Sequence, residues 1–258
     1  MKIHLFHIYP LGLIRIFYQL WAGLKLCRKY GVPLRRYVPL CINPMTSVYN
    51  ADRILADQPR PRTIIDVGAN ESQMARLLSL IAEPGARVLS FEPIPALNPI
   101  GQRFTQALAD TDGTADFFIP GKNDAELGSL YSDVVSRPGQ EGRTIQVQTA
   151  RFDTLVSKGV VSWPELQRPI LLKLDTEGSE LKVLKGFGTF LRDVDYVLTE
   201  VENDDARGRH YDLMELCRRL EEAGFNRSRL THACFCGTTV PSYFDLLFWR
   251  APEQNPPT

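Results

Sequence analysis

Four short apolar runs in this sequence carry an acidic residue at or just beyond their carboxyl ends. The runs are 63–67, 87–91, 170–174 and 194–198, and the acids are Asp66, Glu92, Asp175 and Glu200. Helical segments separate the runs, and this alternation predicts an α/β fold whose mostly parallel sheet is covered by helices on both faces. Ligands of such sheets bind beyond the carboxyl ends of the strands. The four acids are therefore expected to meet at one ligand-binding edge.

The remaining patterns complete this body. Apolar periodicity predicts helices over 72–81, 179–191 and 211–223. Residues 115–119 and 144–148 alternate at period two, which predicts an antiparallel excursion. Strands near Phe225 and over 243–249 would end the fold, and 252–258 has the composition of a loose tail. We expect one domain over residues 51–251, preceded by an extension over residues 1–50.

Charge is divided unevenly between these two parts. The chain has 30 basic and 30 acidic residues, and this net charge of zero argues against nucleic acid as a partner. Residues 1–50 hold seven of the bases and no acid, which leaves 23 bases against 30 acids in the rest of the chain. A basic extension is thus joined to an acidic body.

The extension contains a predicted helix over 11–26. Large apolar residues recur on one face, and a narrower strip containing Arg15, Gln19 and Gly23 lies opposite. Arg15 argues against a membrane span. An aromatic, leucine-rich face with a basic end suits a helix lying in a membrane interface, with contact through residues 3–29; the alternative is a helix that caps the body or a partner. Prolines at 33, 39 and 44 predict a connector before the next helix.

The first strand leads into a turn with Gly68 and Asn70. Gly68 permits close approach of a ligand to the backbone, and the following helix start offers free N–H groups. Of the three glycines of a dinucleotide fingerprint only Gly68 is present, which weakens a nicotinamide reductase as a rival hypothesis. Glu92, 24 residues after Gly68, is well placed to accept hydrogen bonds from a ribose.

The third strand, 170–174, carries the candidate reactive groups. Period two places Lys173 and Asp175 on one side of this strand, and Glu177 follows in the turn. A crowded carboxylate could accept a proton from an alcohol, and a cluster of acids could instead bind a divalent cation. Glu200 and the loop residue His210 are further candidates on the substrate side.

Three motifs in order give the sequence a family resemblance. DVGAN follows the first strand, FEPIP the second, and LLKLDTEGSELKVLKG surrounds the third. Over roughly residues 60–230 the chain resembles the FkbM family of S-adenosylmethionine-dependent methyltransferases. Ser72 stands where the family usually has glycine. Because serine can cap a helix, we expect modest consequences for cofactor binding.

The resemblance implies a Rossmann-like class I methyltransferase sheet whose last strand is antiparallel. It implies that Asp66, Gly68 and Asn70 line the methionine part of S-adenosylmethionine, that Glu92 holds the ribose, and that Pro93 and Ala107 lie beside the adenine. It places Ser129 on the substrate side and Asp175 and Glu177 among the catalytic residues.

The sequence therefore predicts an S-adenosylmethionine-dependent O-methyltransferase that acts on a hydroxyl of a glycan or small natural product. The rival from another class is an inactive methyltransferase-like fold that serves as an interaction subunit. An odd number of cysteines without a CxxC pair indicates reduced thiols and a cytoplasmic protein, attached to the membrane periphery if the extension binds lipid. Acceptor, metal requirement and oligomeric state are left open by the sequence.

Overall fold

The computed structural model describes residues 10–31, 42–95, 98–120, 128–131, 142–202, 212–235 and 241–250. His210 and the expected tail over 252–258 lie outside these residues, as do residues 3–9 of the expected membrane contact.

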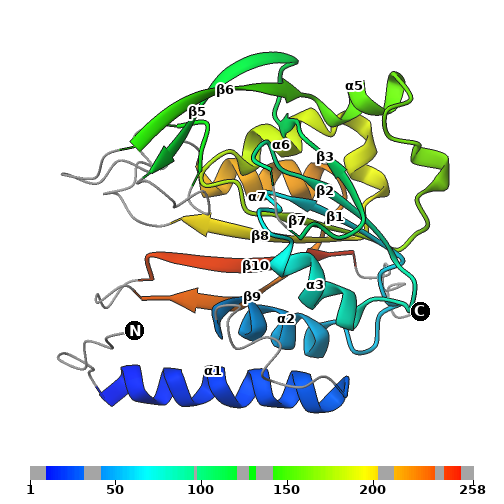
Figure 1. Ribbon diagram of the computed structural model, residues 1–258. Coiled ribbons are helices and arrows are strands. Elements are labelled where there is room, and N and C mark those ends of the chain that lie inside the picture. Colours follow the sequence, from blue (N-terminus) through cyan, green and yellow to red (C-terminus); the bar gives the residue numbers. More distant parts are fainter. Residues whose placement is uncertain are drawn as a thin grey trace.

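A seven-stranded sheet forms the centre of the molecule, in the order β3-β2-β1-β7-β8-β10-β9 (Figure 1). Every strand runs parallel to the others except β10, which is antiparallel to both of its neighbours. The strands are β1 (Thr63–Val67), β2 (Arg87–Phe91), β3 (Gln102–Phe104), β7 (Ile170–Leu174), β8 (Tyr196–Glu202), β9 (Arg227–Cys234) and β10 (Tyr243–Trp249). The predicted mostly parallel sheet with an antiparallel last strand is confirmed.

A smaller sheet in the order β4-β6-β5 lies above the carboxyl ends of the main strands in Figure 1. Its strands are β4 (Ala107–Leu108), β5 (Gly113–Pro120) and β6 (Gly142–Ala150). β5 and β6 pair antiparallel over their whole length, which confirms the excursion that period-two alternation predicts.

Helices cover both faces of the main sheet (Figure 1). One face carries α1 (Pro10–Lys29), α2 (Ile42–Ile54) and α3 (Gln73–Ile81). The other carries α5 (Phe152–Ser157), η3 (Trp163–Glu165), α6 (Glu180–Gly186), η4 (Gly188–Asp193) and α7 (Leu213–Glu222). Two buried clusters result, because successive strand residues point to opposite faces: Ile64 and Leu171 join the α2–α3 side, and Ile65 and Leu172 join the α6–α7 side.

Three predicted elements have different bounds. The helix expected over 179–191 is divided into α6 and η4, because Gly188 adopts φ +56° and ends the α-helical geometry. The strand expected over 194–198 is β8, two residues further on, and the strand expected near Phe225 begins at Arg227. Pro44 lies in the first turn of α2, where a missing N–H is tolerated, and not in a connector.

The first helix docks on the body through the strip that sequence analysis places opposite its apolar face. Gln19, Ala22 and Gly23 are buried, and a Cβ on Gly23 would lie 3.1 Å from Cε of Met45. Small residues thus let α1 approach α2 closely, while the large apolar side chains of Phe17, Leu20, Trp21 and Leu24 stay exposed. The expected domain boundary at residue 50 falls inside α2, which also packs on β9 and α3. None of the described helices combines the length and the apolar character needed to cross a membrane.

Candidate active site

A tight turn after β1 forms the first wall of a cavity at the carboxyl ends of the strands. Gly68 has φ +72°, and a Cβ there would lie 1.7 Å from the carbonyl oxygen of Asp175. Its N–H donates to the carbonyl of Phe91 at 3.0 Å. Only glycine fits this contact between β1 and β7.

Ser72 differs from its expected role. It adopts φ +58° and makes no side-chain capping bond to α3. Its hydroxyl instead accepts the N–H of Ile100 at 3.3 Å. Serine here occupies a left-handed conformation that glycine adopts without strain, which gives a physical reason why glycine suits this position.

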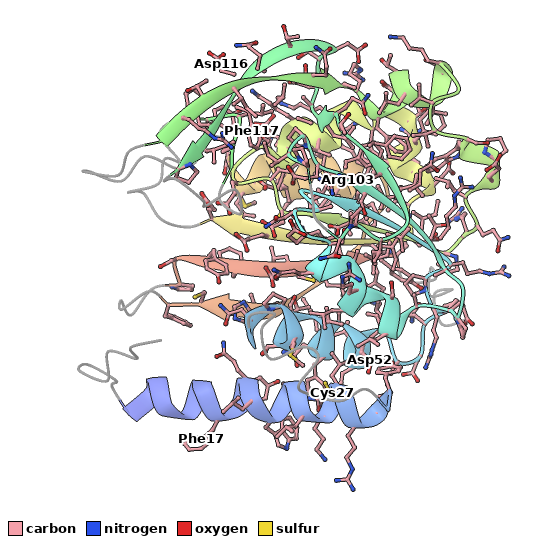
Figure 2. The ribbon with its side chains drawn as sticks, in the orientation of Figure 1. Phe17, Cys27, Asp52, Arg103, Asp116 and Phe117 are labelled. Atoms are coloured by element: carbon pink, nitrogen blue, oxygen red, sulfur yellow. The ribbon has the colours of Figure 1, made fainter. Side chains whose placement is uncertain are left out.

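The carboxylate of Glu92 is fixed by backbone N–H groups from both loops beside it. Oε2 accepts the N–H of Asn70 at 3.0 Å, and Oε1 accepts the N–H of Ile94 at 2.9 Å. Burial raises the pKa of Glu92, and these N–H groups oppose the rise. The guanidinium of Arg103 (Figure 2) donates to the carbonyls of Asn70 and Ile94, so both loops are held together.

Lys173 connects the first strand to the third predicted strand, β7. Its Nζ lies 3.3 Å from a carboxylate oxygen of Asp66 and 3.3 Å from one of Asp175, and donates to the carbonyl of Gly68 at 2.9 Å. Burial alone would lower the pKa of Lys173, but the two carboxylates outweigh it and raise the pKa. The buried ammonium therefore stays charged and fixes both strand ends.

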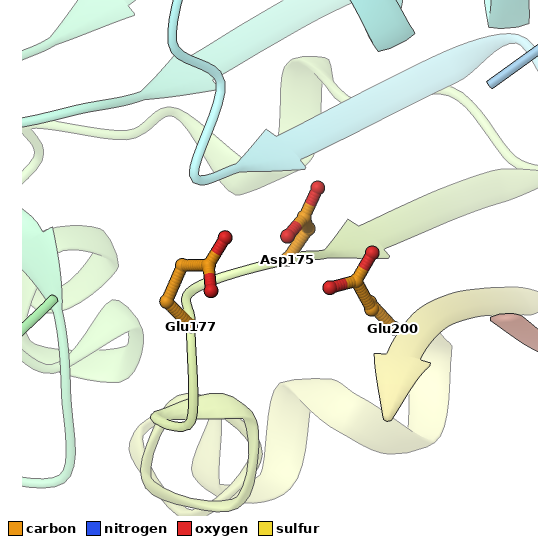
Figure 3. A group of neighbouring side chains, drawn as sticks. All are labelled: Asp175, Glu177 and Glu200. Atoms are coloured by element: carbon orange, nitrogen blue, oxygen red, sulfur yellow. The ribbon is translucent and has the colours of Figure 1, made fainter. Parts of the chain in front are cut away.

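Three carboxylates converge on the other side of the cavity. One oxygen each from Asp175, Glu177 and Glu200 lies within 4.8 Å of the others (Figure 3). Burial raises the pKa of Glu200 well above its ordinary value, and the neighbouring Asp175 and Glu177 add to the shift. Like charges this close favour a bound proton, a cation or a cationic ligand.

Hydrogen bonds with the side chains of Ser129 and Glu180 shape the loop that carries Glu177. Glu177 has φ +52°, and the Ser129 hydroxyl donates to its carbonyl at 2.7 Å. Oε1 of Glu180 accepts the N–H and hydroxyl of Thr176 at 2.7 and 2.9 Å. Ser129 and Glu180 therefore position the loop, and neither side chain reaches the cavity.

The acidic row continues across the sheet to residues that sequence analysis missed. In the strand register Glu200 lies opposite Asp245 of β10, and Asp245 lies opposite His232 of β9. Nδ1 of His232 is 3.8 Å from Oδ2 of Asp245, and burial raises the pKa of Asp245 to about 7. A second, smaller cavity of about 70 Å³ lies between this row and the start of α2. The available signal was Asp245 itself, a charge inside the apolar run YFDLLFW.

The main cavity has a volume of about 340 Å³ and brings most of the predicted residues together. Its lining includes Gly68, Asn70, Glu92, Pro93, Ala107, Asp175, Glu177 and Glu200. Thr176, Ser179 and Tyr243 line it too, and were not predicted.

Two expected site residues are placed differently. The carboxylate of Asp66 is fully buried against Lys173 and does not reach the cavity, because the strand turns its side chain toward α3 and not toward the ligand edge. Ser129 is also fully buried, and only its neighbours Gly128 and Leu130 line the cavity. Both act through the residues that they hold.

The residues that line the cavity fit S-adenosylmethionine. Gly68 and Glu92 both line the cavity, and the buried carboxylate of Glu92 can accept hydrogen bonds from hydroxyls such as those of a ribose. The three carboxylates complement a positively charged sulfonium. With the strand order and antiparallel β10, these features define a Rossmann-like class I methyltransferase fold.

The chain belongs to the FkbM methyltransferase family. The family model described as "Methyltransferase FkbM domain" matches residues 66–227, which is more than half of the chain. The match begins at Asp66 and includes each of the three motifs.

Individual relatives are distant. A curated protein, the hexuronic acid methyltransferase AglP of Haloferax volcanii, is 27% identical over 159 residues. The alignment covers 58% of this chain and 60% of that protein, so the chain spans less than two thirds of its relative's length.

Two solved structures are similar to the chain only at a low level. An S-adenosylmethionine-dependent methyltransferase of Leishmania major has a TM-score of 0.43 and 12% identity, with 89% of this chain and 82% of that chain covered. The magnesium protoporphyrin IX methyltransferase of Synechocystis PCC 6803, with bound cofactor, has a TM-score of 0.38 and 9% identity, with 95% and 99% covered. The family assignment does not depend on either.

Proposed function

We propose that this chain is an S-adenosylmethionine-dependent O-methyltransferase that acts on a hydroxyl of a glycan or small natural product. One observation carries the proposal: a single cavity joins the Gly68 turn and the Glu92 carboxylate to a cluster of three acids. The first pair suits a nucleoside cofactor, and the cluster suits an acceptor that must lose a proton.

The residues on the β1–β2 side hold the cofactor. Glu92 accepts hydrogen bonds from the ribose hydroxyls. Gly68 and Asn70 lie beside the methionine part of the cofactor, and Pro93 and Ala107 lie beside the adenine. When bound, S-adenosylmethionine supplies a methyl group that is already activated for transfer. The protein therefore contributes alignment and proton removal.

The residues on the β7–β8 side select the nucleophile. One carboxylate oxygen from each of three residues, all within 4.8 Å of one another, disfavours a second carboxylate as the group that receives the methyl. A neutral hydroxyl suits this surface, because it can donate its proton to a carboxylate as the new C–O bond forms. Asp175 or Glu177 is the proposed proton acceptor, and Glu200 binds the acceptor molecule.

A sugar acceptor is supported by the name of the curated relative, a hexuronic acid methyltransferase. Clustered carboxylates are also good partners for the several hydroxyls of a sugar, because each carboxylate oxygen accepts hydrogen bonds. His210 is kept as a candidate acceptor-binding residue.

Methyl transfer tests the proposal directly. Labelled S-adenosylmethionine is incubated with hexoses, hexuronic acids and their methyl glycosides, and the label is followed into the sugar. We expect a methyl ether that survives mild alkali. An alkali-labile methyl ester would overturn hydroxyl transfer, and the binding of NAD without S-adenosylhomocysteine would overturn the enzyme class.

Two variants separate the sides of the cavity. Glu92→Gln should weaken S-adenosylhomocysteine binding about tenfold, because one hydrogen bond to a charged group is replaced by a donor facing a donor. Asp175→Asn should lower kcat by about 10² or more and leave cofactor affinity within about threefold. Full activity in Asp175→Asn would remove its assignment, and cofactor binding without any transfer would favour the interaction subunit.

A chelator distinguishes a proton acceptor from a cation site. If the carboxylates act as proton acceptors, activity is unchanged by chelation. Activity that is lost and then restored by Mg²⁺ would reassign Asp175, Glu177 and Glu200 to a divalent cation.

A further inference from the structure

The outward face of α1 is an apolar stripe on the surface of the molecule. Phe17 is 68% exposed and Leu24 51% exposed, and Leu20 and Trp21 between them are also exposed. Spacings of three and four residues place all four on one side of the helix. Figure 2 shows Phe17 pointing away from the body.

This exposure is not the result of a loosely attached helix. Leu26 and Cys27 on the inner face are buried, and the inner Gln19 donates to Asn43 at 2.8 Å and contacts His232 at 3.3 Å. Tyr18 donates to Asn50 at 2.8 Å. The inner face is therefore fixed by packing and hydrogen bonds, and the stripe is held outward by the fold.

The charges beside the stripe are all basic. Lys25 and Arg28 are exposed, and Lys25 lies 5.5 Å above the ring of Trp21. No residue from 10 to 29 is acidic, and the acid that pairs with Lys29 is Asp52 of α2, on the inner side. The outer face thus combines large apolar groups, an aromatic residue with a polar N–H, and positive charge.

We infer that this face docks the protein on an anionic lipid bilayer, with α1 lying flat in the interface. A bilayer buries the apolar stripe and supplies the negative charge that Lys25 and Arg28 lack on this face. A second copy of the chain fits less well, because pairing two such faces brings basic side chains together with no acid between them. The inference does not depend on the methyltransferase activity.

Co-sedimentation with vesicles tests the inference. The probes are vesicles of phosphatidylcholine with about one third phosphatidylglycerol, and vesicles of phosphatidylcholine alone. We expect binding to the anionic vesicles, weakened at least about tenfold by Phe17→Glu with Leu24→Glu, and weakened similarly by Lys25→Glu with Arg28→Glu. Salt at about 1 M should also weaken it.

Met214→Glu is the matched control, because Met214 is a 62% exposed apolar residue on α7, on the opposite face of the sheet. It should bind vesicles as the unmodified protein does, and an unchanged circular dichroism spectrum and urea midpoint check the fold of every variant. Failure of the unmodified protein to bind anionic vesicles would overturn the inference, as would equal binding by the Phe17/Leu24 variant. A Phe17-dependent dimer in light scattering would replace the bilayer with a second copy.

Discussion

Glu92 and the Asp175–Glu177–Glu200 cluster line the same cavity in contrasting surroundings. Each oxygen of Glu92 receives a backbone N–H, and Arg103 ties together the two loops that supply those donors. On the opposite side of the cavity, the carboxylates of Asp175, Glu177 and Glu200 point toward one another. Lys173 is the cation that the structure places beside Asp175. The hydrogen bonds that fix Glu92 are formed before any ligand binds. The three clustered carboxylates are instead stabilised when a proton or a positively charged group binds among them.

This difference separates two tasks within one cavity. A preorganised acceptor such as Glu92 loses little freedom when it binds a diol, which favours affinity. A crowded group of acids takes up positive charge readily, which favours proton transfer. Lys173 touches both sides through Asp66 and Asp175, so it is the physical link between them.

The largest expected effect comes from breaking that link. Lys173→Met leaves Asp66 buried without its cation, so the free energy of unfolding should fall by about 3–5 kcal/mol. Urea denaturation measures the change. Lys185→Met is the control, because Lys185 pairs with Glu215 at the surface, where an ion pair contributes about 1 kcal/mol or less. Equal effects would show that Lys173 does not join the two sides.

A smaller effect follows from closing the turn on the cofactor side. Gly68→Ala places a Cβ against the Asp175 carbonyl, so the β1 and β7 ends must separate. We expect S-adenosylhomocysteine affinity to fall by about 100-fold, which corresponds to about 2.7 kcal/mol in calorimetry. Gly85→Ala is matched in backbone, since Gly85 has φ +83° with no atom within 4 Å of its Cβ position. An equal loss of affinity in Gly85→Ala would contradict a specific role for the contact.

A pH-dependent effect, the smallest of the three when counted for one pH unit, concerns Asp245 at the far end of the acidic row. Burial raises the pKa of Asp245 to about 7 in the folded protein, whereas an aspartate in the unfolded chain has a pKa of about 3.9. Between these two pKa values the folded protein binds one proton more than the unfolded chain. The contribution of Asp245 to the free energy of unfolding therefore falls as pH rises, by at most about 1.4 kcal/mol per pH unit.

Asp245→Asn removes this dependence. Relative to the unmodified protein, the variant should therefore gain stability from about pH 4 to about pH 7, as measured by urea denaturation across that range. Parallel pH profiles for the two proteins would contradict the buried, proton-binding state of Asp245.

The geometry of the proposed cofactor side was largely readable from the sequence, because its signals are local. A strand, a glycine turn and an acid at the next strand end fix Gly68 and Glu92 through neighbouring residues. Period two also places Lys173 and Asp175 on one side of their strand, whereas the pairing of Asp66 with the same lysine follows from the register of β1 with β7, which only the structure shows. The resemblance suggested a cofactor contact for Asp66 that this geometry does not provide.

The proposed acceptor side depends on longer-range structure. His232 and Asp245 join Glu200 only through antiparallel pairing of β10, with a register shift between Asp245 and Leu246 that no local pattern indicates. The sequence left open whether α1 caps the body, and the face through which it docks on α2 was equally hidden. A sequence pattern favours burying the large apolar face, whereas Ala22 and Gly23 allow the close approach to α2 that decides the helix orientation.

The contact between Gln19 and His232 links the first helix to the strand beside the cavity. This 3.3 Å contact joins the helix to β9 next to the acidic row, and α1 also packs on α2, which packs on β9. A molecule held to a surface by such a helix would lose most of its freedom to tumble. The direction in which its cavity opens would then be set by the surface, and acceptors carried by that surface would meet it from a constant angle.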